Sequence, residues 1–264
     1  MKLCFSRFGG ILWLMEISIS AEKLFEIGGL SITNTTIITL VVSVVIVAMF
    51  LYLRSRLRVR PGGFQNIIEF IIESILDLTD SITQDRKLSM KFFPLAITIF
   101  LFVAISNWVE LIPGLGTVGI ERVHNGEQVI IPFLRSGSAD LNMTIALSII
   151  TVFFIQFIGI TALGLRGYLK KFFISPFHKP YLIGTFTGIL ELVSEISRLI
   201  SFSFRLFGNI FAGEVLLIVM LNLVPYIVPL PFLALELFVG FIQAFVFSML
   251  ALVFLKMATI EASH

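Results

Sequence analysis

Residues 201–214 read SFSFRLFGNIFAGE and place one arginine, Arg205, in the middle of a long apolar segment. A guanidinium stays charged in a protein, even in lipid. At the bilayer centre it costs about 3 kcal/mol on insertion scales and about 10 kcal/mol or more in simulations, so it needs water or an anionic partner. On a helix its neighbours three and four residues away are Ser201, Phe202, Gly208 and Asn209, none of them acidic. The counter-charge must therefore come from another helix or another chain.

The composition of the chain indicates an integral membrane protein. Of 264 residues, 57% are hydrophobic and 14% are charged, whereas a soluble domain has about 25% charged residues. The single cysteine, Cys4, excludes an internal disulfide framework, and the histidines are scattered. No glycine-rich phosphate loop or nucleophile elbow occurs. We therefore expect no catalytic site in this chain, no metal, no cofactor and no nucleic-acid partner.

Apolar segments long enough to cross a core of about 30 Å predict five spans, at 32–53, 92–112, 141–165, 185–221 and 232–255. A polar loop is expected at 114–139, and a proline-rich turn precedes the last span. Residues 64–82 alternate apolar positions with Glu69, Glu73, Asp77 and Asp80, which is typical of an amphipathic helix at the interface. The predicted class is all-α, with an N-terminal segment (1–31) and a single membrane domain (32–264).

The fourth span is too long to stand upright in a bilayer. Its 37 residues would extend about 55 Å at 1.5 Å per residue. We therefore expect a strongly tilted helical hairpin at the C-terminal end.

Basic residues predict the orientation of the spans. Seven positive charges lie between the first and second spans, and four between the third and fourth. By the positive-inside rule these loops are cytoplasmic, or on the matrix side, with the N-terminus outside and the C-terminus inside. Three interpretations of the first residues stay open: a weak signal peptide, an interfacial segment, or translation from Met15.

The hairpin arranges its ionisable and amide side chains by depth. Counted from the turn, an outer set holds Glu214 and Glu236, a central set Arg205 and Gln243, and an inner set Glu191 and Glu195. Asn209 lies on the same polar stripe of the helix as Arg205. Intramembrane carboxylates on both sides of an arginine indicate a proton relay.

The arginine motif, with Ala212-Gly213-Glu214 after it, resembles subunit a of the F-type ATP synthase. Further matching motifs in the same order are Pro61 to Asn66 with Glu69, Asn107 to Pro113, Ala139 to Asn142, and Gln243 to Phe247. The resemblance covers most of the chain. It implies a proton-conducting stator with two offset half-channels, which faces a rotor ring of small subunits (subunit c) that carry membrane carboxylates. It also implies a peripheral-stalk partner, subunit b.

By the same resemblance, Arg205 matches the essential arginine of the family, with the polar residues Asn209 and Gln243 near it. Glu214 matches the outer half-channel, Glu191 the inner one, and Glu110 an acidic position at the end of the second span. The position of Glu236 varies within the family. Because mitochondrial members tend to have histidine at 214 and alanine at 208, the resemblance favours a bacterial plasma membrane over the mitochondrial inner membrane.

Several residues also have a structural interpretation. In this interpretation Arg198 has no direct role in proton transfer and only pairs with Glu191 or Glu195 on its own helix. Glu195 would then serve only as the structural partner of Arg198. Glu110 would be an interfacial carboxylate, and Asp140 the N-cap of the third span. The alternative function is that of a secondary ion transporter, which would usually show internal repeats, or of another ion-conducting membrane protein. A structural membrane scaffold is a further class.

Overall fold

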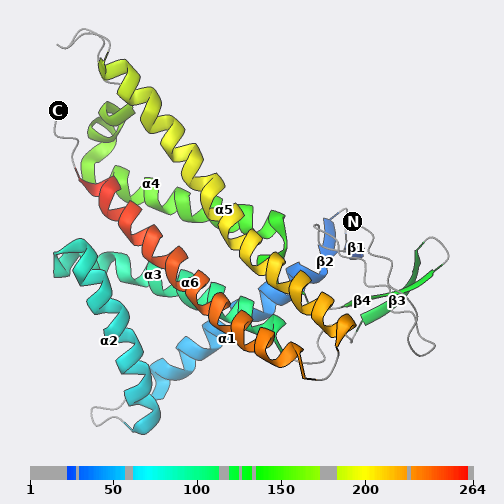
Figure 1. Cartoon of the computed structure of the whole chain (residues 1–264). Helices are drawn as coiled ribbons and strands as arrows, with labels where there is room; N and C mark the ends of the chain where they lie inside the picture. The colour runs from blue at the N-terminus through cyan, green and yellow to red at the C-terminus, as the bar shows by residue number, and fades with distance from the viewer. Residues whose placement is uncertain are drawn as a thin grey trace. The chain divides into compact units, whose positions relative to one another are not determined.

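The computed structural model describes residues 23–27, 30–56, 62–112, 119–124, 127–132, 135–172, 183–224 and 227–260. Its α-helices (Figure 1) are α1 (Asn34–Arg56), α2 (Gly63–Thr83), α3 (Arg86–Glu110), α4 (Leu141–Phe172), α5 (Ile183–Leu223) and α6 (Pro229–Thr259). Within these residues five helices are long and apolar enough to cross a membrane: α1, α3, α4, α5 and α6. The prediction of an all-α membrane protein with five spans is confirmed.

The spanning helices extend beyond the predicted spans at one end or both, and for α3, α6 and α4 the reason is local. Helix α3 begins at Arg86 because Asp85 precedes it and its carboxylate accepts the backbone N–H of Lys87 at 2.8 Å. Helix α6 includes Pro229 and Pro231, since proline is tolerated in a first turn, where its missing N–H has no helical partner. Helix α4 continues to Phe172 through a break at Gly164, whose φ of 72° suits only glycine well.

Two antiparallel hairpins lie outside the spans. Strand β1 (Lys23–Ile27) pairs with β2 (Leu30–Thr33), and β3 (Gly119–His124) pairs with β4 (Glu127–Pro132). The second hairpin occupies the predicted polar loop at 114–139. Asn125-Gly126 stands between its strands in the sequence, and this pair favours two-residue turns.

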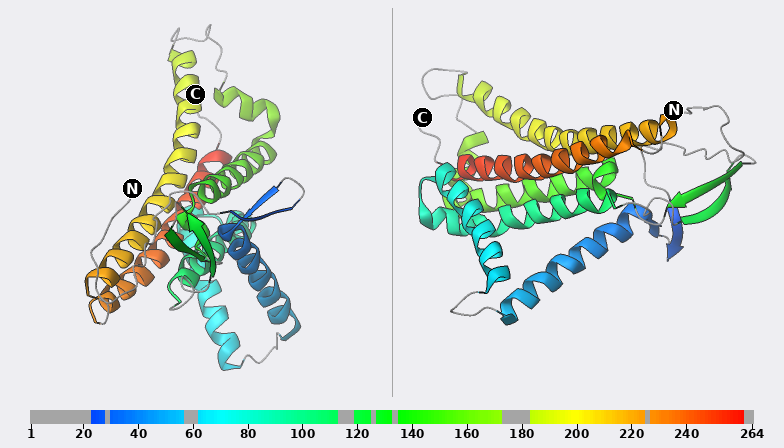
Figure 2. Two further views of the ribbon diagram at one scale, coloured as in Figure 1. Left: turned by 90° about the vertical axis from the view of Figure 1, so that its right-hand side faces the viewer. Right: turned by 60° about the horizontal axis from the view of Figure 1, so that its bottom comes forward.

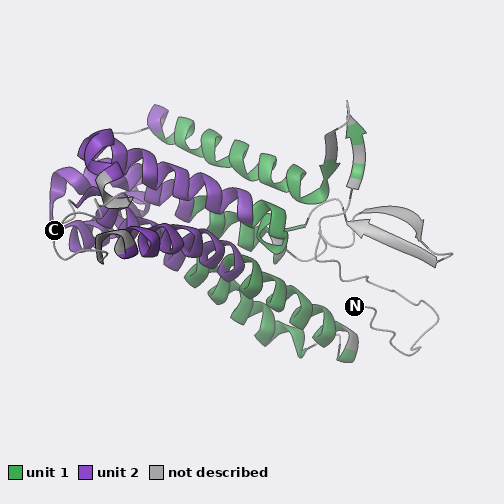
Figure 3. Ribbon diagram, turned by 90° about the horizontal axis from the view of Figure 1, so that it is seen from above, with its two compact units in different colours: residues 1–53, 101–144, 206–243 green, residues 54–100, 145–205, 244–264 purple. Residues whose placement is uncertain are grey.

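The described helices form two compact units (Figure 3). Unit 1 comprises residues 1–53, 101–144 and 206–243, and unit 2 comprises residues 54–100, 145–205 and 244–264. Helices α3, α4, α5 and α6 each contribute residues to both units.

In unit 1, α1 packs on the second half of α3. Ile38, Val42 and Ile46 are buried against Phe102, Ile105 and Val109. Asp140 accepts the backbone N–H of Asn142 at 3.0 Å and the hydroxyl of Thr35 at 3.1 Å. The prediction that Asp140 caps the third span is confirmed, and the same carboxylate ties α4 to the start of α1.

The end of α3 is also joined to α6 within unit 1. The side-chain amide of Asn107 donates to the Gly240 carbonyl at 3.0 Å, and the indole of Trp108 donates to the Leu237 carbonyl at 3.1 Å. A Cβ at Gly240 would lie 3.1 Å from that of Asn107. The small residue therefore permits the close approach of the two helices.

In unit 2, α3, α4 and α6 share a core and lie side by side in Figure 2. Its buried members are Phe92, Ala96, Ile155, Leu252, Leu255 and Ala258. The break at Gly164 brings Tyr168 back onto α4, where a Cβ at Gly159 would lie 2.8 Å from its ring. Tyr168 is 5% exposed, so the last part of α4 covers the same helix's earlier turns.

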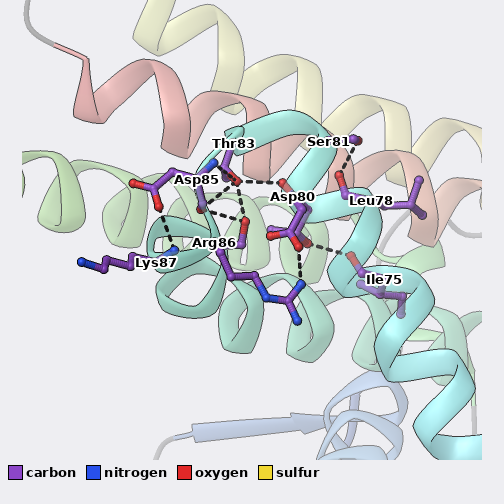
Figure 4. A network of polar contacts seen from close by, with 10 residues as sticks. Ile75, Leu78, Asp80, Ser81, Thr83, Asp85, Arg86 and Lys87 are labelled. Atoms are coloured by element: carbon purple, nitrogen blue, oxygen red, sulfur yellow. Dashed lines mark hydrogen bonds and ion pairs between the residues drawn. The ribbon is translucent and has the colours of Figure 1, made fainter.

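Helix α2 joins this unit through a polar turn (Figure 4). Arg86 forms an ion pair with Asp80, and the hydroxyls of Thr83 and Ser89 are hydrogen-bonded to each other. Lys256 of α6 donates to the Ile82 carbonyl at 2.6 Å, which places a cation at the C-terminal end of α2. The acidic face of α2, with Glu69, Glu73 and Asp77, is exposed as predicted for an amphipathic helix.

The hydrogen bond from Ser89 and the Arg86 guanidinium lower the pKa of Asp80 below its ordinary value, against the opposing effect of burial.

The choice between Met1 and Met15 lies outside the described residues. The tilt of the last hairpin and the division into an N-terminal segment and one membrane domain stay predictions.

Candidate functional site: ionisable residues of the spans

Arg205 lies half-buried on α5. Its guanidinium donates to the hydroxyl of Ser201, one turn earlier, at 3.0 Å. The neighbouring Phe204 is 55% exposed, so this face of the helix is open in the isolated chain. Among the residues that the structure describes, Arg205 has no ion pair with a carboxylate, which agrees with the expectation that its counter-charge is not on its own helix.

Asn209 and Gln243 come together in unit 1. The Asn209 amide donates to the Gln243 side-chain carbonyl at 2.6 Å. Gln243 is 3% exposed, and its amide nitrogen is buried with no hydrogen-bond acceptor among the described residues. These two predicted residues thus form one contact that joins α5 to α6, with a donor left over for another acceptor.

Glu214 is held by a residue that the sequence analysis did not assign to the site. Arg135, in the segment before α4, donates from Nε to one carboxylate oxygen at 3.1 Å and from Nη2 to the other at 2.8 Å. The side chains are only 9% and 18% exposed. A buried bidentate pair of this kind is strong and fixes the orientation of both groups. The sequence shows only a single arginine five residues before Asp140, and this position alone does not indicate which carboxylate it contacts.

Glu236 is buried against the backbone of α5. It is 9% exposed, and no hydrogen bond or ion pair to it occurs within the described part of the chain. A Cβ built on Gly213 would lie 1.9, 2.1 and 2.2 Å from the carboxylate atoms of Glu236. The carboxylate therefore occupies the space that a side chain at position 213 would fill.

The inner carboxylates form a cluster in unit 2. Arg198 donates to Glu195 at 2.5 Å and lies 3.7 Å from Glu191. The Arg198 guanidinium also lies 4.6 Å from the centre of the Phe254 ring, a cation–π distance. The predicted pairing of Arg198 on its own helix is confirmed. A further residue, Gln156 of α4, donates to the second oxygen of Glu195 at 2.6 Å.

The structure thus brings the predicted residues into local groups. Unit 1 contains the Asn209–Gln243 contact, the Arg135–Glu214 pair and the buried Glu236; unit 2 contains Arg205 and the Glu191–Glu195–Arg198 cluster. Glu110 is the last residue of α3, and its side chain lies outside the described part of the structure. Among the described residues, no group of three or more His, Cys, Asp or Glu side chains could hold a metal ion.

Comparison with known proteins identifies the family. Residues 36–256 match the family described as ATP synthase A chain. The ATP synthase subunit a of Helicobacter hepaticus is 33% identical over 248 residues, which cover 90% of this chain and 97% of the relative. That of Campylobacter jejuni subsp. jejuni is 35% identical over 230 residues, covering 86% and 90%. That of Moorella thermoacetica is 28% identical over 234 residues, covering 88% and 94%.

These matches extend over all five spans and include the arginine motif of α5. The chain belongs to the ATP synthase A chain family, the membrane subunits a of a proton-translocating complex.

Proposed function

We propose that this subunit is the stator that conducts protons in the Fo sector, through two offset half-channels separated by Arg205. The observation that carries the proposal is the placement of Arg205: it is charged, half-buried within a membrane span, bonded to the Ser201 hydroxyl, and without a carboxylate partner among the described residues. In a family of ATP synthase subunits, the missing anion is a carboxylate on each subunit of a rotor ring.

The outer half-channel uses Glu236 and Glu214. Both oxygens of Glu214 already accept hydrogen bonds from the Arg135 guanidinium, so this carboxylate has a cationic partner within the chain. Glu236 is buried without such a partner within the described residues. We assign the uptake of the proton from outside to Glu236, and to Glu214 the role of a fixed negative charge beside it.

Arg205 separates the two paths electrostatically. It would pair with each deprotonated rotor carboxylate as the carboxylate arrives, and its fixed charge would repel a proton moving directly between the half-channels. The Asn209–Gln243 contact at 2.6 Å leaves the buried amide nitrogen of Gln243 with no acceptor among the described residues. A rotor carboxylate that has received a proton is neutral and can turn toward lipid.

The inner half-channel uses the cluster of Glu191 and Glu195. Glu191 would take the proton released by the rotor carboxylate and pass it to the inner solution, while Glu195 and Arg198 shape its surroundings. Glu110 would belong to the outer entrance. Each proton that crosses 100 mV yields about 2.3 kcal/mol, so several protons must be coupled to each ATP made elsewhere in the complex.

The partners and the location follow from the same proposal. The subunit would contact the ring of subunit c, the peripheral-stalk subunit b and the lipid of a bacterial plasma membrane. Its basic loops would face the cytoplasm, with the N-terminus outside and the C-terminus inside.

The test replaces Arg205 in the whole complex. Arg205→Ala should abolish ATP-driven proton pumping in inverted membrane vesicles, while Arg86→Ala, which removes an exposed arginine at the first residue of α3, should leave pumping intact. Immunoblots of the a, b and c subunits check that both variants assemble. ATP-driven pumping that survives Arg205→Ala would refute the assignment.

A further inference from the structure

Two consecutive residues of α3 hold the backbone of α6. The side-chain amide of Asn107 donates to the Gly240 carbonyl at 3.0 Å, and the indole N–H of Trp108 donates to the Leu237 carbonyl at 3.1 Å. Gly240 follows Leu237 by three residues, so the two carbonyls lie on one side of α6. Asn107 and Trp108 therefore form a clamp with two points of attachment, and we call this pair the α3 clamp.

The α3 clamp binds the main chain, and this decides what it restrains. A helical carbonyl already accepts the N–H four residues later, and its second lone pair is open to a side-chain donor. A bond between two side chains can persist while both change rotamer, whereas a bond to a backbone carbonyl persists only while the helix keeps its place. The two bonds therefore restrain the rotation of α6 about its axis and its sliding along α3.

Close packing reinforces the two hydrogen bonds. A Cβ at Gly240 would lie 3.1 Å from the Cβ of Asn107 and 3.8 Å from Cδ1 of Trp108, so the missing side chain lets α6 approach the α3 clamp directly. The Trp108 ring also stacks on Phe241, with centroids 6.3 Å apart and an interplanar angle of 17°. Asn107 is 3% exposed, which protects its amide donor from competing water.

The turn of α3 that carries the α3 clamp is itself supported within unit 1. The carbonyl of Ser106, directly before Asn107, accepts the Ser136 hydroxyl at 3.3 Å. Val109, directly after Trp108, packs against buried residues of α1. Because the turn is held on both sides, the α3 clamp is a fixed support for α6.

The α3 clamp lies between the two residues of α6 that belong to the candidate site. Glu236 precedes Leu237 by one residue, and Gln243 follows Gly240 by three. Glu236 and Gln243 are seven residues apart and so share one face of the helix. A rotation of α6 by about 20° would move atoms about 5 Å from its axis by about 2 Å. Misplacement of a reacting group by about 1 Å can already cost about 100-fold in rate.

We propose that the α3 clamp is a positioning element of the outer half-channel: it fixes the rotation and depth of α6, and so places Glu236 and Gln243 against α5. The inference rests on the proposed function of this site. Asn107 and Trp108 take no proton themselves, because they act through the backbone of α6.

The first measurement reports the position of α6 without any reference to proton conduction. In the whole complex with Cys4→Ser, Gly213→Cys and Glu236→Cys are introduced together, since the Glu236 side chain occupies the space beside Gly213. Oxidation with copper–phenanthroline should link the two cysteines, and mass spectrometry of the digested subunit measures the yield. Asn107→Leu with Trp108→Phe removes both donors and nearly keeps the side-chain sizes. It should lower the disulfide yield by about threefold or more, because a disulfide tolerates only a narrow geometry.

The second measurement is passive proton conduction in vesicles that carry the whole Fo sector and are stripped of the catalytic part. Trp108→Phe keeps an aromatic ring on Phe241 but removes the N–H donor, and conduction should fall by about 3- to 10-fold. Trp108→His keeps a ring N–H and should recover about half of the parental conduction or more. Thr98→Val is the matched control on α3, since the Thr98 hydroxyl donates to the Pro94 carbonyl of the same helix at 2.7 Å. It should conduct within about twofold of the parent protein.

An undiminished disulfide yield without the two donors would overturn the proposal, and so would parental conduction by Trp108→Phe or an equal loss in Trp108→His. Should the variant with both substitutions fail to assemble, the disulfide yield with Trp108→Phe alone decides, and a fall is expected there too. The disulfide yield does not depend on proton transfer, so its failure leaves the Arg205→Ala result untouched. Pumping by Arg205→Ala would instead remove the half-channels and leave the attachment of α6 to α3 as measured.

Discussion

Gly213→Ala tests the position of the Glu236 carboxylate. The added Cβ would lie 1.9 Å from one Glu236 oxygen, and ordinary contact begins at 3.4 Å, so the carboxylate must retreat by about 1.5 Å. Misplacement of a reacting group by about 1 Å can cost about 100-fold in rate. We expect passive proton conduction to fall by about 10- to 100-fold.

The same substitution should not weaken the helix. Alanine is favoured over glycine in a helix interior by about 1 kcal/mol, so lost conduction would not come from unfolding of α5. Gly208→Ala is the matched control on the same helix, because among the described residues nothing beyond the helix's own backbone lies within 4 Å of its added Cβ. This variant should conduct within about twofold of the parent protein.

A second substitution sharpens the test. Glu236→Asp shortens the side chain by one methylene, about 1.5 Å of reach, and should restore part of the conduction when it is combined with Gly213→Ala. The assay is the decay of a pH gradient in stripped vesicles, normalised to the amount of assembled subunit. Parental conduction by Gly213→Ala, or equal losses at positions 213 and 208, would show that the Glu236 carboxylate does not act from the observed place.

Two further predictions concern charged pairs. Arg135→Gln leaves the Glu214 carboxylate without its bidentate partner, and loss of one partner of a buried pair costs about 3–5 kcal/mol. The amount of assembled complex and its proton conduction should therefore both fall, and Arg135→Lys should be less severe. Normal levels of both in Arg135→Gln would contradict the role of the pair. The lowered pKa of Asp80 means that its ionised form stabilises the fold above the ordinary value near 3.8 and that this contribution is lost as the pH falls through the folded-state value. Thermal unfolding of the detergent-solubilised complex should therefore separate the parent protein from Asp80→Asn at pH 7, and the difference should shrink toward pH 3; a difference that grows in acid would give the opposite sign.

The spans and the acidic amphipathic helix could be predicted because both are local patterns. Hydropathy over about 20 residues and a period of 3.6 depend on neighbours in the sequence. The pairing of Arg198 with Glu195 is local as well, since the two are three residues apart on one helix. Asp140 could be assigned as a cap for the same reason, because a cap bonds to the turn that follows it.

The contacts of Glu214 with Arg135, of Glu195 with Gln156 and of Glu236 with Gly213 could not be predicted in this way. Arg135 is 79 residues from Glu214, and Gln156 is 39 residues from Glu195. Helical periodicity says which face a residue occupies, but not which neighbouring helix meets that face. Gly213 gave no signal of its own, because a glycine in a helix does not reveal which side chain fills the space it leaves.

Irregular backbone was missed for a related reason. Gly164 looks in the sequence like any glycine of an apolar span, yet its φ of 72° redirects the end of α4 and places Tyr168 near the inner cluster. A hydropathy window averages over such a residue. Likewise, the short hairpin of β3 and β4 lies in a segment whose polarity alone indicated a loop.

The separation between Arg135 and Glu214 has a consequence for biogenesis. Glu195 leaves the ribosome with its guanidinium partner three residues behind it, so that charge can be neutralised inside a single inserting helix. Glu214 instead pairs with an arginine that is synthesised 79 residues earlier. Its charge stays uncompensated until α4 has been inserted and α5 has packed beside Arg135. Inserting the second half of α5 into the membrane therefore costs more free energy than inserting the first half. A quality-control protease that acts on newly inserted chains would degrade Arg135 variants at that step, before assembly with any rotor subunit.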